Sequence, residues 1–72
     1  MPLTLMVNGE TRVLDPAPNP ASLAAVVALL ANNSQLVVAE HNGVIAPRSR
    51  WDNTMVKDDD TIEIVTIVGG GS

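Results

Sequence analysis

The C-terminal residues of this chain are the first candidates for chemistry. Gly69, Gly70 and Gly71 follow an apolar run, and Ser72 is the last residue of the sequence. Glycine has no side chain, so a run of glycines lets another backbone approach closely and suits a tail that threads into a narrow channel of a partner. Gly-Gly-Gly-Ser is also typical of a flexible linker, so the tail alone leaves both interpretations open.

The remaining titratable residues form no catalytic set. His41 is the only histidine, and the sequence assigns it no nucleophile to activate, so we expect a solvent-exposed strand residue rather than a general base. Asp58, Asp59 and Asp60 lack the alternating register of a calcium-binding loop and are typical of a solvated turn. The sequence therefore predicts neither an enzyme nor a metal site.

A second group of candidates surrounds the only aromatic residue. Trp51 is expected to pack in the core, while the alternative is a partly exposed ring near the tail that contacts a partner. Arg48 and Arg50 lie close to it in the sequence and are second-tier candidates for docking contacts.

Composition excludes several classes of protein. The net charge is -4 and there is one aromatic residue, which argues against a nucleic-acid binder. No apolar stretch approaches the roughly 20 residues of a membrane span, and the N-terminus lacks the features of a signal peptide. Without cysteine there is no disulfide, thiolate metal site or cysteine nucleophile. We expect one folded cytoplasmic domain.

The first part of the chain predicts a β-hairpin followed by a helix. Residues 2–7 alternate apolar and polar side chains, Asn8-Gly9 supplies the positive φ angles of a type I′ turn, and residues 10–14 return. Three prolines then end the strand. A helix follows, with an apolar stripe of Leu23, Val26, Val27 and Leu30. Ser22 is preferred to Asn19 as the N-cap of this helix, and residues 32–34 are expected to end it.

The second part predicts three more strands. They cover residues 36–41, 44–45 and 61–68, with a second Asn-Gly turn after the first of them and a single helical turn around Trp51. Both faces of the segment 61–68 are partly apolar, which is typical of a central strand. A central last strand must lie parallel to the first strand, with the helix over one face.

This order of elements predicts an α+β fold of the β-grasp (ubiquitin-like) type. It has a mixed sheet of about four to five strands covered by one helix. Residues 1–68 form the domain, and residues 69–72 form a flexible glycine tail.

Motifs along nearly the whole chain resemble the thiamine-biosynthesis sulfur carrier (ThiS) family. They are the first strand ending in Asn8-Gly9, the run from Val38 to Arg48, Trp51, the run from Asp58 to Val65, and the terminal glycines. Each motif is weak alone, and their order and spacing make the resemblance specific.

The resemblance implies a carrier without an active site or bound cofactor. An E1-like adenylyltransferase (ThiF type) consumes ATP to adenylate the terminal glycine carboxylate, and a sulfur donor system converts it to a thiocarboxylate. The thiocarboxylate then gives its sulfur to thiazole synthase (ThiG type). By this resemblance the reactive terminus is Gly71, or alternatively Gly70, and the residues that thread the partner active sites are Val68, Gly69 and Gly70.

The chain departs from the family pattern at two positions. Ser72 follows the glycines, so it is either removed before use or foreign to the natural protein. Asp59 stands where many relatives have glycine, and aspartate tolerates the left-handed conformation with some strain. The alternatives are a carrier like the molybdopterin-synthase small subunit, which is usually longer and richer in aromatic residues, and a β-grasp binding module that is not a carrier.

Overall fold

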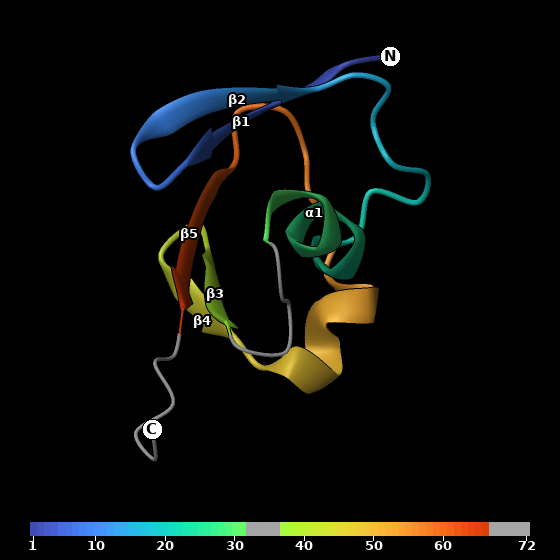
Figure 1. Ribbon diagram of the computed structural model, residues 1–72. Helices are drawn as coiled ribbons and strands as arrows, with labels where there is room; N and C mark the ends of the chain where they lie inside the picture. The colour runs from blue at the N-terminus through green and yellow to red at the C-terminus, as the bar shows by residue number, and fades with distance from the viewer. Residues whose placement is uncertain (32–36, 67–72) are drawn as a thin grey trace.

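Residues 1–31 and 37–66 form a five-stranded mixed sheet with one α-helix over one face (Figure 1). The computed structural model describes residues 1–31 and 37–66. The elements are β1 (Leu3–Val7), β2 (Glu10–Leu14), α1 (Leu23–Leu30), β3 (Val37–His41), β4 (Val44–Ala46), the 3₁₀ helix η2 (Arg48–Asn53) and β5 (Thr61–Thr66). The strand order β2-β1-β5-β3-β4 confirms the predicted β-grasp arrangement.

Two Asn-Gly turns build the two hairpins, as predicted. Asn8 and Gly9 have φ angles of 50° and 84°, and Asn42 and Gly43 have φ angles of 52° and 86°. These positive values are the ones a type I′ turn requires, and asparagine and glycine are the residues that adopt them at least cost. The turns therefore fix the registers of β1 with β2 and of β3 with β4.

The helix α1 begins where the apolar stripe predicts. Ser22 is the N-cap, and its Oγ accepts a hydrogen bond of 3.1 Å from the N–H of Ala25. Leu23, Val26 and Val27 are buried against the sheet, and α1 ends at Leu30. The predicted helix end at residues 32–34 lies outside the described residues. No helix within residues 1–31 and 37–66 is long and apolar enough to cross a membrane.

The last strand is central, between β1 and β3. It runs parallel to β1, with Val7 opposite Ile62, and antiparallel to β3, with Ala39 opposite Ile64. The central position predicted for β5 is confirmed. The apolar residues on its two faces, from which that position is predicted, are buried on one face only. Ile62 is fully buried, whereas Val65 on the other face is 60% exposed, because α1 covers only the face that carries Ile62.

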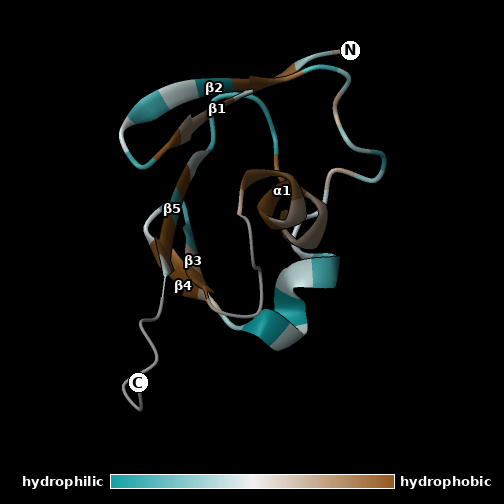
Figure 2. Ribbon diagram, in the orientation of Figure 1, coloured by the Kyte–Doolittle hydropathy of each residue, from teal (hydrophilic) through white to brown (hydrophobic). Residues whose placement is uncertain are grey.

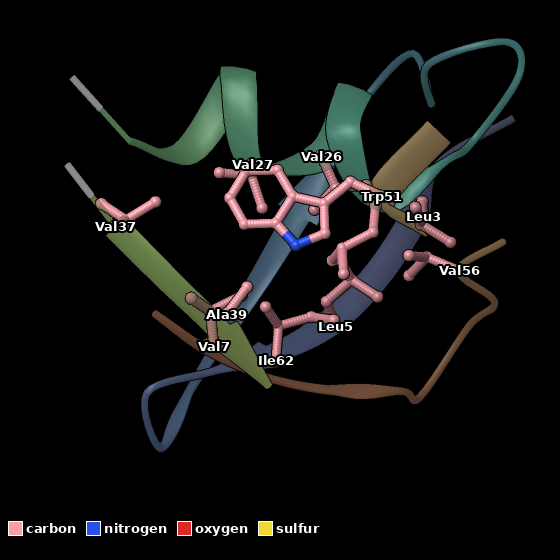
Figure 3. Close-up of a cluster of buried hydrophobic side chains, with 11 residues drawn as sticks. Leu3, Leu5, Val7, Val26, Val27, Val37, Ala39, Trp51, Val56 and Ile62 are labelled. Atoms are coloured by element: carbon pink, nitrogen blue, oxygen red, sulfur yellow. The ribbon is translucent and has the colours of Figure 1, made fainter. Parts of the chain in front are cut away.

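The core lies between α1 and the covered face of the sheet (Figure 3). Side chains from β1 and α1 meet those from η2 and β5 there, and Trp51 closes the cluster with 5% of its surface exposed. The buried apolar residues are Leu3, Leu5, Val7, Leu23, Val26, Val27, Val37, Ala39, Trp51, Val56 and Ile62. Because β5 crosses the middle of this core, its direction is fixed by packing as well as by hydrogen bonds.

Candidate functional site at the end of β5

The candidate site is the end of β5, because this strand leads into the glycine-rich residues. Thr66 is its last residue and the last that the structure describes. The residues expected to thread a partner (Val68, Gly69 and Gly70), the expected reactive terminus (Gly71) and the expected domain boundary lie outside the described residues. What the structure does define is the set of elements that hold Thr66 and set the direction of the strand.

The two neighbours of β5 reach different distances along it. β3 stays paired with β5 to its end, where Val37 lies opposite Thr66. The register of β1 with β5 covers only Met6 with Thr61 and Val7 with Ile62. The C-terminal end of β5, which we call its exit, is therefore paired with β3 but not with β1.

Asn8 supports β5 from the other side. Its main-chain N–H donates a hydrogen bond of 2.9 Å to the carbonyl of Ile62. Its side-chain Oδ1 accepts from the N–H of Ile64 at 2.7 Å, and its Nδ2 donates to the carbonyl of Ile64 at 3.1 Å. The sequence pattern predicts only the turn role of Asn8, because a bond to a residue 56 positions away leaves no local signal in the sequence.

The face of the sheet that α1 does not cover carries an apolar patch beside the exit of β5. Val38 and Val65 lie opposite each other on β3 and β5, and Ile45 on β4 lies opposite Glu40. Val65 and Ile45 are 60% and 62% exposed. We call Val38, Ile45 and Val65 the open-face patch; Figure 2 shows hydrophobic colour where β3, β4 and β5 lie side by side.

An acidic pair borders the open-face patch. Glu40 and Glu63 lie directly opposite each other on β3 and β5, on the same face as Val38 and Val65. Like charges in this position repel each other and destabilise the sheet slightly. A surface that joins exposed apolar side chains with two carboxylates is suited to a partner that presents apolar and basic groups.

Arg48 and Trp51 are in contact, and Arg48 also bonds Val37, which lies opposite the last residue of β5. The indole Nε1 donates a hydrogen bond of 2.9 Å to the carbonyl of Ala46, and the Arg48 guanidinium carbon lies 4.4 Å from the ring centroid. Arg48 Nη2 also donates to the carbonyl of Val37 at 3.3 Å. The core role of Trp51 is thus confirmed, and its burial leaves little of the indole for a partner to contact.

The structure separates Arg50 from Arg48. Arg48 and Trp51 line a shallow depression of about 330 Å³ that extends to Val38 and Ile45. Arg50 instead lines a second depression of about 190 Å³, which includes His41. The depression that Arg48 lines includes Val38 and Ile45 of the open-face patch, whereas the one that Arg50 lines includes only Ile45 of it. Docking through either arginine remains a prediction.

His41 and Asp60 form a pair at the opposite end of β5. His41 Nε2 lies 2.7 Å from Asp60 Oδ2, and the two side chains are 20% and 17% exposed. The expected solvent-exposed histidine is therefore wrong: Asp60, in the turn before β5, lies against the imidazole, and most of the His41 side chain is shielded from solvent. Partial burial acts to raise the pKa of Asp60, but the hydrogen bonds from His41 and from the main-chain N–H of Lys57 outweigh it and hold that pKa below its usual value.

The acidic turn is exposed to solvent, as expected, and it is also hydrogen-bonded to β1. Asp58 and Asp59 are exposed, but Asp58 Oδ1 accepts a hydrogen bond of 2.9 Å from the N–H of Thr4, and the N–H of Asp59 donates to the carbonyl of Thr4 at 2.8 Å. Asp59 adopts the anticipated left-handed conformation, with φ of 70°. Within residues 1–31 and 37–66 there is no group of three acidic, histidine or cysteine side chains that could hold a metal ion.

Comparison with known proteins identifies the family. Residues 5–71 match the ThiS family. The chain belongs to the ThiS family. A solved ThiS-family structure, described as thiamine biosynthesis protein (ThiS) from Geobacter metallireducens, superposes with a TM-score of 0.79 at 31% identity and covers 96% of this chain and 100% of that one. The chain is thus a ubiquitin-like sulfur carrier, and ThiS-family carriers are small carrier proteins rather than enzymes.

Similar sequences occur both as small proteins and within a larger one. The uncharacterized protein ycf40 of Trieres chinensis is 51% identical over 39 residues, which is 54% of this chain and 53% of that protein. The ycf40 protein of Pyropia yezoensis is 33% identical over 96% of this chain and 93% of its own length. A thiazole synthase of Paramagnetospirillum magneticum is 34% identical over 97% of this ThiS-family chain, which spans only 21% of that synthase.

Proposed function

We propose that this protein is a cytoplasmic sulfur carrier for thiamine biosynthesis, in which the carboxylate of a C-terminal glycine becomes a thiocarboxylate. The observation that carries the proposal is that the ThiS-family match extends to residue 71 and so includes the glycines. The solved relative described as a thiamine biosynthesis protein favours thiamine over the molybdopterin pathway.

The chemistry needs an activating partner because a carboxylate is a poor electrophile. An E1-like adenylyltransferase of the ThiF type joins the carboxylate of Gly71 to the α-phosphorus of ATP and releases pyrophosphate. A sulfur donor system then supplies sulfur at the oxidation level of sulfide, which attacks the carbonyl carbon, forms the carbon–sulfur bond and displaces AMP, leaving a thiocarboxylate at the chain end. Glycines before this carbonyl leave room for the approach of the partner's groups.

A thiazole synthase of the ThiG type is the proposed acceptor of the sulfur. Support comes from the Paramagnetospirillum magneticum thiazole synthase, one polypeptide that contains a region similar to this chain along with much additional sequence. Joining two functions in one chain keeps their effective concentration high, as is useful when one delivers a group to the other.

The open-face patch and Arg48 are the proposed docking contacts for these partners. The patch is exposed, lies beside the exit of β5 and adjoins a depression that Arg48 lines. A partner that covers it faces the strand from which the tail continues. Docking there would bring the partner's active site within reach of the glycines, and binding energy would be used to position the tail.

A mass measurement tests the proposed function. The protein is prepared with its chain ending at Gly71, at Gly70 or at Ser72, and each form is incubated with ATP, the cognate adenylyltransferase and a sulfur source. The Gly71 form is expected to gain the mass difference between sulfur and oxygen, and the Ser72 form is expected to stay unchanged. The carrier proposal fails if neither glycine-terminated form gains this mass.

A further inference from the structure

We infer that Asn8 is a positioning residue for the reactive tail: its side-chain amide continues the pairing of β1 with β5 and sets the direction in which the chain leaves the sheet. The inference rests on the proposed function, because it concerns how the tail is presented for adenylation. It goes beyond that function by naming a residue outside the tail and outside the open-face patch.

The hydrogen bonds follow the alternation of a parallel pair of strands and then pass from backbone to side chain. The N–H of Met6 donates to Asp60 at 3.0 Å, and the N–H of Asn8 donates to Ile62 at 2.9 Å. The next hydrogen bonds between β1 and β5 would use the N–H and carbonyl of Ile64. However, β1 has ended there, and the chain turns at Asn8-Gly9 toward β2. The Asn8 amide meets both groups of Ile64 instead.

An amide side chain is well matched to this task. It is planar and presents one carbonyl acceptor and one N–H donor toward Ile64, and so supplies the C=O and the N–H that two successive peptide groups of a longer β1 would supply. The same residue must also hold φ of 50° in the turn. Glycine, asparagine and aspartate tolerate that conformation, and only asparagine among them carries both a side-chain donor and an acceptor.

Asn42 provides an internal comparison. It occupies the equivalent place in the second Asn-Gly turn, with φ of 52°, and its Oδ1 accepts a hydrogen bond of 2.8 Å from the N–H of Thr61. The two turn asparagines therefore both bind β5, Asn42 at its first residue and Asn8 at its fourth. Of the two asparagines, only Asn8 binds a residue in the second half of β5, the half nearer the C-terminus.

The consequence concerns the last residues of β5. Without the Asn8 amide, the segment from Ile64 to Thr66 would be bonded to a neighbouring strand on the β3 side only. Its outer edge would exchange hydrogen bonds with water, and the strand end would sample a wider range of directions. Docking of the folded domain on a partner would be unchanged, while fewer docked complexes would hold the glycine carboxylate in the reactive position.

Three variants test the inference in chains that end at Gly71. Asn8→Gly keeps the turn and removes the amide, and Asn8→Asp keeps the acceptor but turns an oxygen toward the carbonyl of Ile64. Asn42→Gly is the matched control. Amide hydrogen exchange and backbone relaxation are measured for each, together with the steady-state rate of carrier-dependent pyrophosphate release by the cognate adenylyltransferase.

The expected result separates the two turns. In Asn8→Gly the exchange of the Ile64 amide rises by about tenfold, as loss of its one hydrogen-bond acceptor, the Asn8 side-chain Oδ1, implies, and the order parameter of Thr66 falls. Its kcat for adenylation falls by about three- to tenfold while KM stays within about twofold, because positioning is lost and docking is kept. Asn8→Asp keeps the acceptor of the Ile64 N–H, so that amide exchanges less fast than in Asn8→Gly. The order parameter of Thr66 and kcat still fall in Asn8→Asp, because the carbonyl of Ile64 loses its donor and faces an oxygen instead. In Asn42→Gly only the Thr61 amide exchanges faster, and kcat is unchanged.

Two results would overturn the inference. One is unchanged exchange of Ile64 and unchanged order of Thr66 in Asn8→Gly; the other is an equal fall of kcat in Asn8→Gly and Asn42→Gly. If the unmodified protein is not adenylated at all, the proposed function fails, and the exchange and relaxation data still decide whether Asn8 orients the end of β5.

Discussion

Replacing Asp60 with asparagine tests the electrostatic contact at the start of β5. The carboxylate accepts a hydrogen bond of 2.9 Å from the N–H of Lys57 and lies 2.7 Å from His41 Nε2. It thereby ties the turn before β5 to the end of β3. Asparagine keeps the size of the side chain and one acceptor, but it removes the negative charge that makes both bonds strong.

The expected loss follows from the number and exposure of these bonds. A hydrogen bond to a charged group contributes about 1.5–3 kcal/mol when well buried, and exposed ion pairs contribute about 0–1 kcal/mol. The Asp60 side chain is 17% exposed, so we place the cost of Asp60→Asn between these limits, at about 1–2 kcal/mol at pH 7. For a domain of this size, that corresponds to a fall in Tm of roughly 4–16 °C.

The pH dependence has a defined sign. The pKa of Asp60 is lower in the folded protein than its ordinary value, so the carboxylate stabilises the fold fully above the unfolded-state pKa of about 4. This contribution is lost as the pH falls through the lower folded-state pKa. The difference in unfolding free energy between the unmodified protein and Asp60→Asn should therefore be constant down to about pH 4 and shrink below it.

Urea unfolding followed by the fluorescence of Trp51 measures this difference. The buried indole is the only tryptophan and reports loss of the core. Asp59→Asn is the control, because it removes the same charge one residue earlier at an exposed side chain whose left-handed backbone suits asparagine. The reasoning is refuted if Asp59→Asn and Asp60→Asn are equally stable, or if the Asp60→Asn difference persists unchanged at pH 2.5.

Two further substitutions probe the core and the docking surface. Ile62→Ala should lower the unfolding free energy by about 2–5 kcal/mol in the same urea assay, because it opens a cavity at a fully buried position of the central strand; a loss below about 1 kcal/mol would contradict that packing. Val65→Ser should change the unfolding free energy by less than about 0.5 kcal/mol yet raise KM for adenylation. The control Val13→Ser, at a similarly exposed residue on β2, should leave KM unchanged. Equal effects of the two substitutions on KM would remove the open-face patch from the proposed interface.

Local features of the fold could be predicted from the sequence because their causes are local. The Asn-Gly turns require positive φ, and the Ser22 cap and the apolar stripe of α1 lie within one short segment. The central place of β5 was also predicted, from its apolar composition. The exposure of Val65 was not, since alternation cannot tell which face of a sheet a single helix will cover.

Contacts at the candidate site depend on residues far apart in the chain. The bonds from Asn8 to Ile64 join residues 56 positions apart, and the His41–Asp60 contact joins residues 19 positions apart. Neither pair shows a spacing that propensity or periodicity could detect. The sequence therefore predicts only one of the two roles of Asn8, and it does not predict that Asp60 shields His41 from solvent.

The parallel pairing of β1 with β5 also bears on how the chain folds during synthesis. The hairpin of β1 and β2 can form early because its contacts are local, and α1 can follow it. The core stays open, however, until Ile62 emerges and inserts between β1 and β3, so closure must bring together the first and last strands of the sheet. Such long-range pairing slows folding and leaves the apolar face of β1 accessible to chaperones until the final strand arrives.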